Sequence, residues 1–140
     1  MKSDALQAAY QATTYRVFLP AGALDLRVGE ANAGLITWLA DAGESVWAVL
    51  TACNPASQAL PDNENRERQA RLEVKLLERE FEPYAGENVA DDAAWPIEET
   101  CFVAGISVKD CTELARQFGQ NAFVCGRDDG VPHLIWVEKE

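Results

Sequence analysis

The pattern of apolar and polar residues along the chain predicts several strands. Some segments alternate apolar and polar side chains, which is typical of a strand with one buried face. Others are continuous apolar runs, which are typical of a strand covered on both faces. The first two strands are expected to form a hairpin, and Arg127-Asp-Asp-Gly130 predicts a second hairpin near the other end. The predicted strands cover residues 14–19, 24–28, 45–50, 100–106, 122–125 and 133–137.

Apolar residues at helical spacing predict about four helices. The longest begins near Pro61 or Asp62 and continues to about Glu80. On a helical wheel it has an apolar stripe with Leu72 and Leu76 at its flank. The stripe consists of Ala70, Val74, Leu77 and Phe81. The shorter helices are expected near residues 4–10, 35–42 and 108–118.

Residues 82–96 show neither a helical nor a strand period, and they are rich in Pro, Gly, Asn and Asp. We therefore predict a loop or an irregular edge there. The order of the remaining elements mixes helices with strands and has hairpins at both ends. This order predicts an α+β fold, in a single domain over residues 1–140, with a mixed, largely antiparallel sheet packed by the helices.

Charge narrows the range of partners. The chain has 23 acidic and 12 basic residues, a formal net charge of −11, which repels phosphate backbones and anionic membranes. The arginines at 66, 68 and 71 alternate with glutamates, as on a solvated helix face. No segment has the roughly 20 apolar residues of a membrane span. We expect neither nucleic acid nor membrane as a partner, and the sequence leaves a protein partner open.

Cysteine and histidine usage predicts no metal site, and the absence of a G-x-G-x-x-G motif or of a Gly-rich phosphate loop with Lys predicts no nucleotide cofactor. The four cysteines form no C-x-x-C pair, and the single histidine, His133, cannot complete a zinc set at familiar spacing. The first residues contain no apolar run of signal-peptide length. Because disulfides persist mainly in oxidising compartments, we expect a reducing, cytoplasmic location.

The candidate site is the polar segment Thr51–Ser57, which connects a buried strand to the longest helix. Ligands often bind beyond the carboxyl ends of strands and beside helix N-termini, where free N–H groups favour an anion. Thr51, Asn54 and Ser57 supply hydroxyl and amide groups there. The segment therefore predicts a binding site for a small polar or anionic ligand.

Polar residues outside this segment extend the candidate site. Asn65, Arg66 and Gln69 fall beside the apolar stripe of the longest helix, so we expect their side chains to point inward. Leaving such groups buried without a partner costs about 1–3 kcal/mol each. They either anchor the Thr51–Ser57 segment, which is the simpler interpretation, or contact a ligand. Gln120 is a further ligand candidate, or it binds the last carbonyls of the preceding helix.

Glu98 and Glu99 suggest a second function, that of an enzyme, because they directly precede a buried strand. One of them could be the general base of a hydrolase or transferase that uses a nearby hydroxyl of Thr51 or Ser57. Pairing with Arg66 is the simpler role for either glutamate. Adjacent residues of a strand point to opposite faces, so the two do not form a close dyad. A protein-interaction domain without a small-molecule site is a third possibility, and the sequence does not decide whether the chain is an enzyme.

Several of these residues occur in an order that resembles a known family. The series is Ala9-Tyr10 with Thr13 and Tyr15, then Thr51-x-x-Asn54-Pro55-x-Ser57, Asn65-x-x-Arg68-Gln69-x-x-Leu72, Trp95-Pro-x-Glu-Glu99 and Gly119-Gln-Asn-Ala122. It resembles a bacterial family catalogued as domain of unknown function 3293, over nearly the whole chain. The resemblance implies a bacterial, cytosolic, single-domain protein and no mechanism. It includes Arg68, which the wheel places on the exposed side of the helix.

Overall fold

A seven-stranded sheet forms the centre of the molecule in the computed structural model, which describes residues 4–137. The strand order is β2-β1-β4-β5-β3-β6-β7, and every described pairing is antiparallel. The strands are β1 Thr13–Leu19, β2 Gly22–Leu26, β3 Val46–Leu50, β4 Tyr84–Ala90, β5 Glu98–Ala104, β6 Ala122–Arg127 and β7 His133–Trp136. The predicted α+β fold with a hairpin at each end is confirmed. The sequence predicted a mixed, largely antiparallel sheet, and in the structure all described strand pairs are antiparallel.

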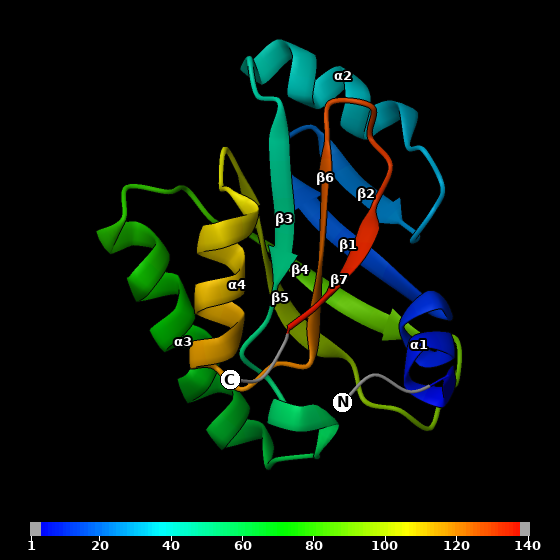
Figure 1. The fold of residues 1–140 in the computed structure, drawn as a ribbon, viewed down its shortest axis with the longest axis vertical. Coiled ribbons are helices and arrows are strands. Elements are labelled where there is room, and N and C mark those ends of the chain that lie inside the picture. The colour runs from blue at the N-terminus through cyan, green and yellow to red at the C-terminus, as the bar shows by residue number, and fades with distance from the viewer. Residues whose placement is uncertain (1–3, 138–140) are drawn as a thin grey trace.

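Helices cover both faces of the sheet (Figure 1). They are α1 Asp4–Gln11, α2 Ala33–Ala42, α3 Asp62–Glu78 and α4 Val108–Gln117, with a short 3-10 turn, η1, at Pro55–Ser57. The alternation of β3 explains the two layers of core. Ala48 and Leu50 pack toward α3 and α4, whereas Trp47 and Val49 pack toward α2 on the other face. The continuous apolar run of β3 is therefore that of a strand buried on both faces.

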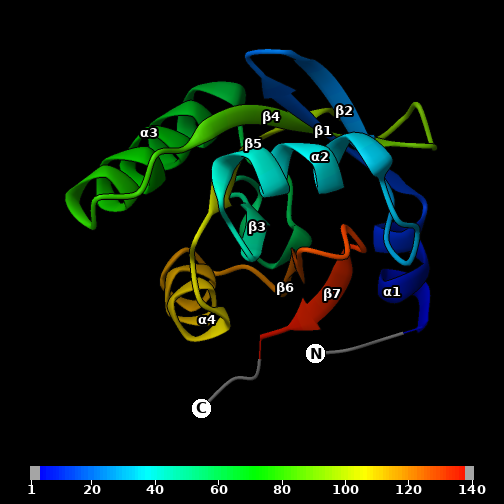
Figure 2. The ribbon, with the colours of Figure 1, turned by 90° about the horizontal axis from the view of Figure 1, so that it is seen from above.

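The sheet curls around α2, and α3 and α4 lie outside the curl (Figure 2). The segment that follows edge strand β2 contacts the segment that precedes edge strand β7, because Gly29 N donates to Pro132 O at 2.8 Å and Asn32 N donates to Gly130 O at 3.1 Å. Helix α2 fills one end of the concave side, and α1 lies at the other end (Figure 1). The Tyr10 ring of α1 meets the edge of Trp136 on β7, with 5.6 Å between ring centroids.

Strand β4 is a correction to the sequence analysis, which predicted a loop for this segment. Gly86 lies in its middle, and an added Cβ there would stand 2.5 Å from Arg16 O and 2.7 Å from Thr100 Oγ1. Only glycine therefore permits the close approach of β1, β4 and β5 at this point. Pairing with β1 on one side and β5 on the other stabilises the strand, and local composition does not report such pairing.

The buried face of α3 is a second correction. The helix has nearly the predicted bounds, but Leu72 and Leu76 are its core residues, whereas Leu77 is 60% exposed and Val74 is 53% exposed. Ala70 is also exposed, and Phe81 is half-buried beyond the helix end. The helix is polar enough that its few apolar residues fit two wheel phases, and contact with the sheet selects one of them.

Candidate functional site

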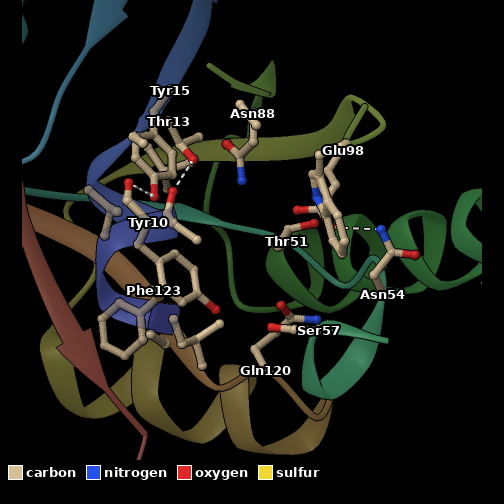
Figure 3. Close-up of a pocket in the computed structure, with 18 of the residues that line it drawn as sticks. Tyr10, Thr13, Tyr15, Thr51, Asn54, Ser57, Asn88, Glu98, Gln120 and Phe123 are labelled. Atoms are coloured by element: carbon tan, nitrogen blue, oxygen red, sulfur yellow. Dashed lines mark hydrogen bonds between the residues drawn. The ribbon is translucent and has the colours of Figure 1, made fainter. Parts of the chain in front are cut away.

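A pocket of about 400 Å³ lies between helix α1, the sheet and the Thr51–Ser57 loop (Figure 3). Its volume falls within the roughly 300–1,000 Å³ of typical small-molecule sites. The alternation of side chains along the strands positions these lining residues. Thr13 and Tyr15 share one face of β1, and Val49 of β3 lies two residues before Thr51, which follows the end of that strand. Helix α1 and the Thr51–Ser57 loop complete the pocket.

The pocket has an aromatic side and a polar side. Tyr10, Tyr15 and Phe123 gather on one side, and Glu98 and Asn54 lie opposite them (Figure 3). An apolar surface facing a small number of placed polar groups is the usual composition of a ligand pocket. The arrangement suits a molecule with an apolar body and a hydrogen-bonding head.

Glu98 is the half-buried carboxylate of the polar side. Asn54 Nδ2 donates to its Oε2 at 2.7 Å. Burial raises the pKa of Glu98 above the ordinary value for glutamate, and hydrogen bonds from Asn54 and Asn88 oppose that rise. Asp92 adds a second carboxylate, and the described residues that line the pocket include no Lys, Arg or His. The described lining is therefore a region of negative potential when both carboxylates are ionised.

Hydroxyl groups face this carboxylate from α1 and from the loop. Burial raises the pKa of the Tyr10 phenol, a hydrogen bond with Ser57 lowers it, and the charge of Glu98 raises it further. The Ser57 hydroxyl also accepts from Asn121 Nδ2 at 3.0 Å. The Tyr15 phenol donates to Tyr10 O at 3.1 Å, and its pKa is raised chiefly by burial. Both phenols therefore stay protonated near neutral pH and can act as donors.

The loop is fixed to α3 by polar side chains of that helix. Gln69, which is 1% exposed, accepts from Ala52 N at 3.0 Å, and Arg68 Nε donates to Ala52 O at 2.7 Å. Asn65 and Asn54 are joined twice, because Asn54 N donates to Asn65 Oδ1 at 2.9 Å and Asn65 Nδ2 donates to Asn54 Oδ1 at 2.8 Å. Asn65 and Gln69 therefore act as loop anchors, which was the simpler interpretation of the sequence.

The segment after α4 holds the loop from the opposite side. Gln120 Nε2 donates to Cys53 O at 2.9 Å, and Ala56 N donates to Gly119 O at 2.8 Å. Arg68 joins both supports, because its Nη2 donates to Phe118 O. The contacts of Gln120 and Gly119 fix the loop backbone just before η1, at Cys53, and within it, at Ala56.

The loop backbone is strained. Asn54, Ala56 and Ser57 have φ values of 46°, 55° and 60°, which lie in the left-handed region that favours glycine. For a residue with a Cβ this conformation costs on the order of 1 kcal/mol. Such strain persists only where surrounding contacts determine the conformation. Here the contacts with α3 and with the segment after α4 hold Asn54 against Glu98 and Ser57 beside Tyr10.

We expect Ala56→Gly to raise the free energy of unfolding by about 0.5–1 kcal/mol, because glycine has no Cβ penalty at positive φ. Ala56 is exposed, so the change removes little packing. The matched control is Ala59→Gly, another exposed alanine of this connection that lies outside the set with positive φ. It is expected to be neutral or destabilising. Urea unfolding of both variants measures the difference, and equal effects would show that Ala56 is not strained.

The structure separates the residues that the sequence suggested as ligand contacts. Those that line the pocket are Thr51, Asn54, Ser57 and Gln120, together with the candidate base Glu98. Glu99 is exposed, and its backbone carbonyl accepts from Thr51 Oγ1 at 2.8 Å. Arg66 is also exposed, so the expectation that it points inward was wrong. Arg68 is the arginine that points inward and contacts the loop, because the buried face of α3 passes through Asn65, Gln69 and Leu72.

Sequence reasoning missed the aromatic side of the pocket and Asn88. Tyr10, Thr13 and Tyr15 carried a signal, because they belong to the ordered series that resembles a known family, but no physical pattern marked them as lining residues. Asn88 lies in the segment predicted as a loop, and its pairing opposite Glu98 on β5 appears only in the sheet.

Comparison with known proteins places the chain in a family. The sequence profile of "Protein of unknown function (DUF3293)" matches residues 50–123, from the end of β3 into β6. The match includes the Thr51–Ser57 loop, all of α3 and Glu98. No curated protein and no solved structure matches the chain. No helix within residues 4–137 is long and apolar enough to cross a membrane. Because the match covers more than half of its residues, the chain belongs to the DUF3293 family of proteins of unknown function.

Proposed function

We propose that this protein binds a small molecule that has an apolar body and a hydrogen-bonding head. The observation that carries the proposal is the pocket in which a half-buried carboxylate, Glu98, faces an aromatic side formed by Tyr10, Tyr15 and Phe123. Asn54 orients this carboxylate at 2.7 Å, and the strained loop orients Asn54 in turn. A fixed polar group inside an apolar pocket is the arrangement that gives a ligand its orientation.

The lining favours an uncharged or cationic head over an anionic one. Glu98 and Asp92 contribute negative charge, and the described lining residues contribute no basic side chain. The first turn of α3, where the sequence suggested an anion site, does not line the pocket and carries Asp62 and Glu64. The ligand is therefore expected at the carboxyl end of β3, inside the curl of the sheet.

Paired glutamine substitutions test this proposal. The melting temperature of wild type, Glu98→Gln and Glu99→Gln would be measured against a panel of neutral, cationic and anionic aromatic molecules. A ligand at 100 times its dissociation constant stabilises the folded state by about 2.7 kcal/mol. We expect such a shift in wild type and in Glu99→Gln, and a smaller one in Glu98→Gln. Absence of any shift in wild type, or equal loss in both variants, would contradict the proposal.

A second candidate is a hydrolase or transferase with Glu98 as the general base, and the raised pKa of Glu98 favours it. The Thr51 hydroxyl donates to Glu99 O, which leaves Ser57 as the candidate nucleophile. However, the described partners of Ser57 are Asn121 and Tyr10, and Glu98 accepts from Asn54. Since base and hydroxyl have separate partners, binding is the better supported function. Turnover of an activated ester that is lost in both Glu98→Gln and Ser57→Ala would favour the enzyme instead.

We also propose that the protein functions in the bacterial cytoplasm. All four cysteines are free and buried, and burial raises the pKa of each thiol. Free thiols persist in a reducing compartment. The protein-interaction alternative has less support, because Trp38 packs against Tyr84 and Phe102, and Trp95, which is 42% exposed, lines the pocket.

A further inference from the structure

We propose that the ligand head is a cationic ammonium group, which binds the Glu98 carboxylate while its apolar body lies against the aromatic side of the pocket. This inference rests on the proposed binding function and names the chemical class of the ligand.

The charges around the pocket support a cation. Glu98 enters from β5 and Asp92 from the segment after β4, and the described lining residues include no basic side chain to neutralise them. The ion pairs of the described residues join Arg16 to Asp25 and Glu87, and Arg27 to Asp91, so none of them uses Glu98 or Asp92. The formal net charge of −11 also attracts cations toward the molecule at long range.

The environment of Glu98 leaves room for a charged donor. An ionised carboxylate has about four acceptor positions. Asn54 occupies one at 2.7 Å, and Asn88 is the other described side chain that hydrogen-bonds Glu98. Both partners are neutral amides, so neither compensates the negative charge that burial makes costly. An ammonium group supplies the missing charge together with up to three N–H donors.

Other ionisable groups around Glu98 do not compete for this role. Tyr10 from α1, Tyr15 from β1 and Cys53 from the loop each interact with the charge of Glu98, and burial raises the pKa of all three. They therefore remain neutral near pH 7, so that Glu98 and Asp92 determine the charge of the described lining. The rings of Tyr10 and Phe123 lie across from Glu98 (Figure 3), and ring faces also attract cations.

Three probes of similar size and different head charge test the inference: 2-phenylethylamine, 2-phenylethanol and phenylacetate. Calorimetric titration at pH 7 would measure their affinity for wild type, Glu98→Gln and Glu99→Gln. We expect the amine to bind wild type best. Its affinity should fall on the order of tenfold or more in Glu98→Gln, since a hydrogen bond to a charged group is lost. The affinity of the alcohol should change little, because glutamine still accepts a hydrogen bond.

Asp92→Asn provides a second variant at an exposed position, and asparagine keeps the oxygen that accepts from Ala94 N at 2.9 Å. We expect it to weaken amine binding by about two- to fivefold, as for an exposed charge pair. The inference of a cationic head is contradicted if the alcohol or phenylacetate binds as tightly as the amine, or if Glu98→Gln leaves amine affinity unchanged. Either result leaves the proposed binding function intact. If none of the three probes binds wild type and the broader panel also gives no shift, both proposals fail.

Discussion

Replacing Leu76 by alanine is expected to lower the free energy of unfolding by about 2–5 kcal/mol, because the change leaves a cavity in a closed core. Leu76 belongs to α3, is 0% exposed and packs in the core that α3 forms with the sheet and α4. Its neighbour Leu77 is 60% exposed. Leu77→Ala is therefore the matched control, and we expect it to change stability by less than about 0.5 kcal/mol. Urea unfolding followed by tryptophan fluorescence measures both.

This pair also tests the phase of α3 on which the site depends. The same rotation that buries Leu76 directs Asn65, Arg68 and Gln69 toward the Thr51–Ser57 loop. A larger loss of stability in Leu77→Ala than in Leu76→Ala would restore the wheel phase predicted from the sequence. It would also contradict the contact of Arg68 with Ala52 O, because that phase places Arg68 on the exposed side of the helix.

Replacing Asn54 by aspartate is expected to lower stability by at least about 2 kcal/mol at neutral pH. The substitution keeps an oxygen that accepts from Leu60 N and from Asn65 Nδ2. It replaces the amide that donates to Glu98 at 2.7 Å by a second carboxylate oxygen. A donor is lost, and two acidic groups meet at hydrogen-bonding distance in a half-buried site.

The Asn54→Asp deficit is expected to depend on pH. Two carboxylates at this distance share a proton, so the pKa of the pair in the folded state is raised above that in the unfolded state. The folded variant then holds more protons than the unfolded chain, and its stability falls as the pH rises above about 4. The burial that raises the pKa of Glu98 acts in the same direction. The deficit should therefore be smallest in acid and largest near pH 7.

Asn63→Asp is the control for the added charge. Asn63 is exposed in the first turn of α3, where an acidic residue is neutral or slightly stabilising because it complements the helix dipole. Equilibrium unfolding of both variants between pH 4 and pH 8 measures the difference. Equal, pH-independent effects in the two variants would show that Asn54 does not orient Glu98.

The sequence predicted most elements of the fold because local periodicity carries that information. The run around Val49 indicated a strand covered on both faces, and apolar residues at helical spacing predicted helices near residues 35–42 and 108–118, where the structure has α2 and α4. Strand β4 escaped prediction because Gly86 and Asn88 disfavour strands locally, whereas pairing on both sides stabilises them in the sheet.

The candidate site was partly accessible from the sequence. The polar loop was evident because Thr51, Asn54 and Ser57 interrupt an apolar strand just before a helix. The aromatic side was not, since Tyr10 and Phe123 are more than a hundred residues apart in the chain and meet only across the curled sheet.

The sequence by itself determined the α+β class, the order of most elements and the polar loop, because each depends on residues close together in the chain. The tertiary structure alone decided which face of α3 is buried, and hence that Arg68 rather than Arg66 reaches the loop. It also decided that Glu98 meets Asn54. These outcomes depend on contacts between segments far apart in the chain, and such contacts leave no period in the sequence.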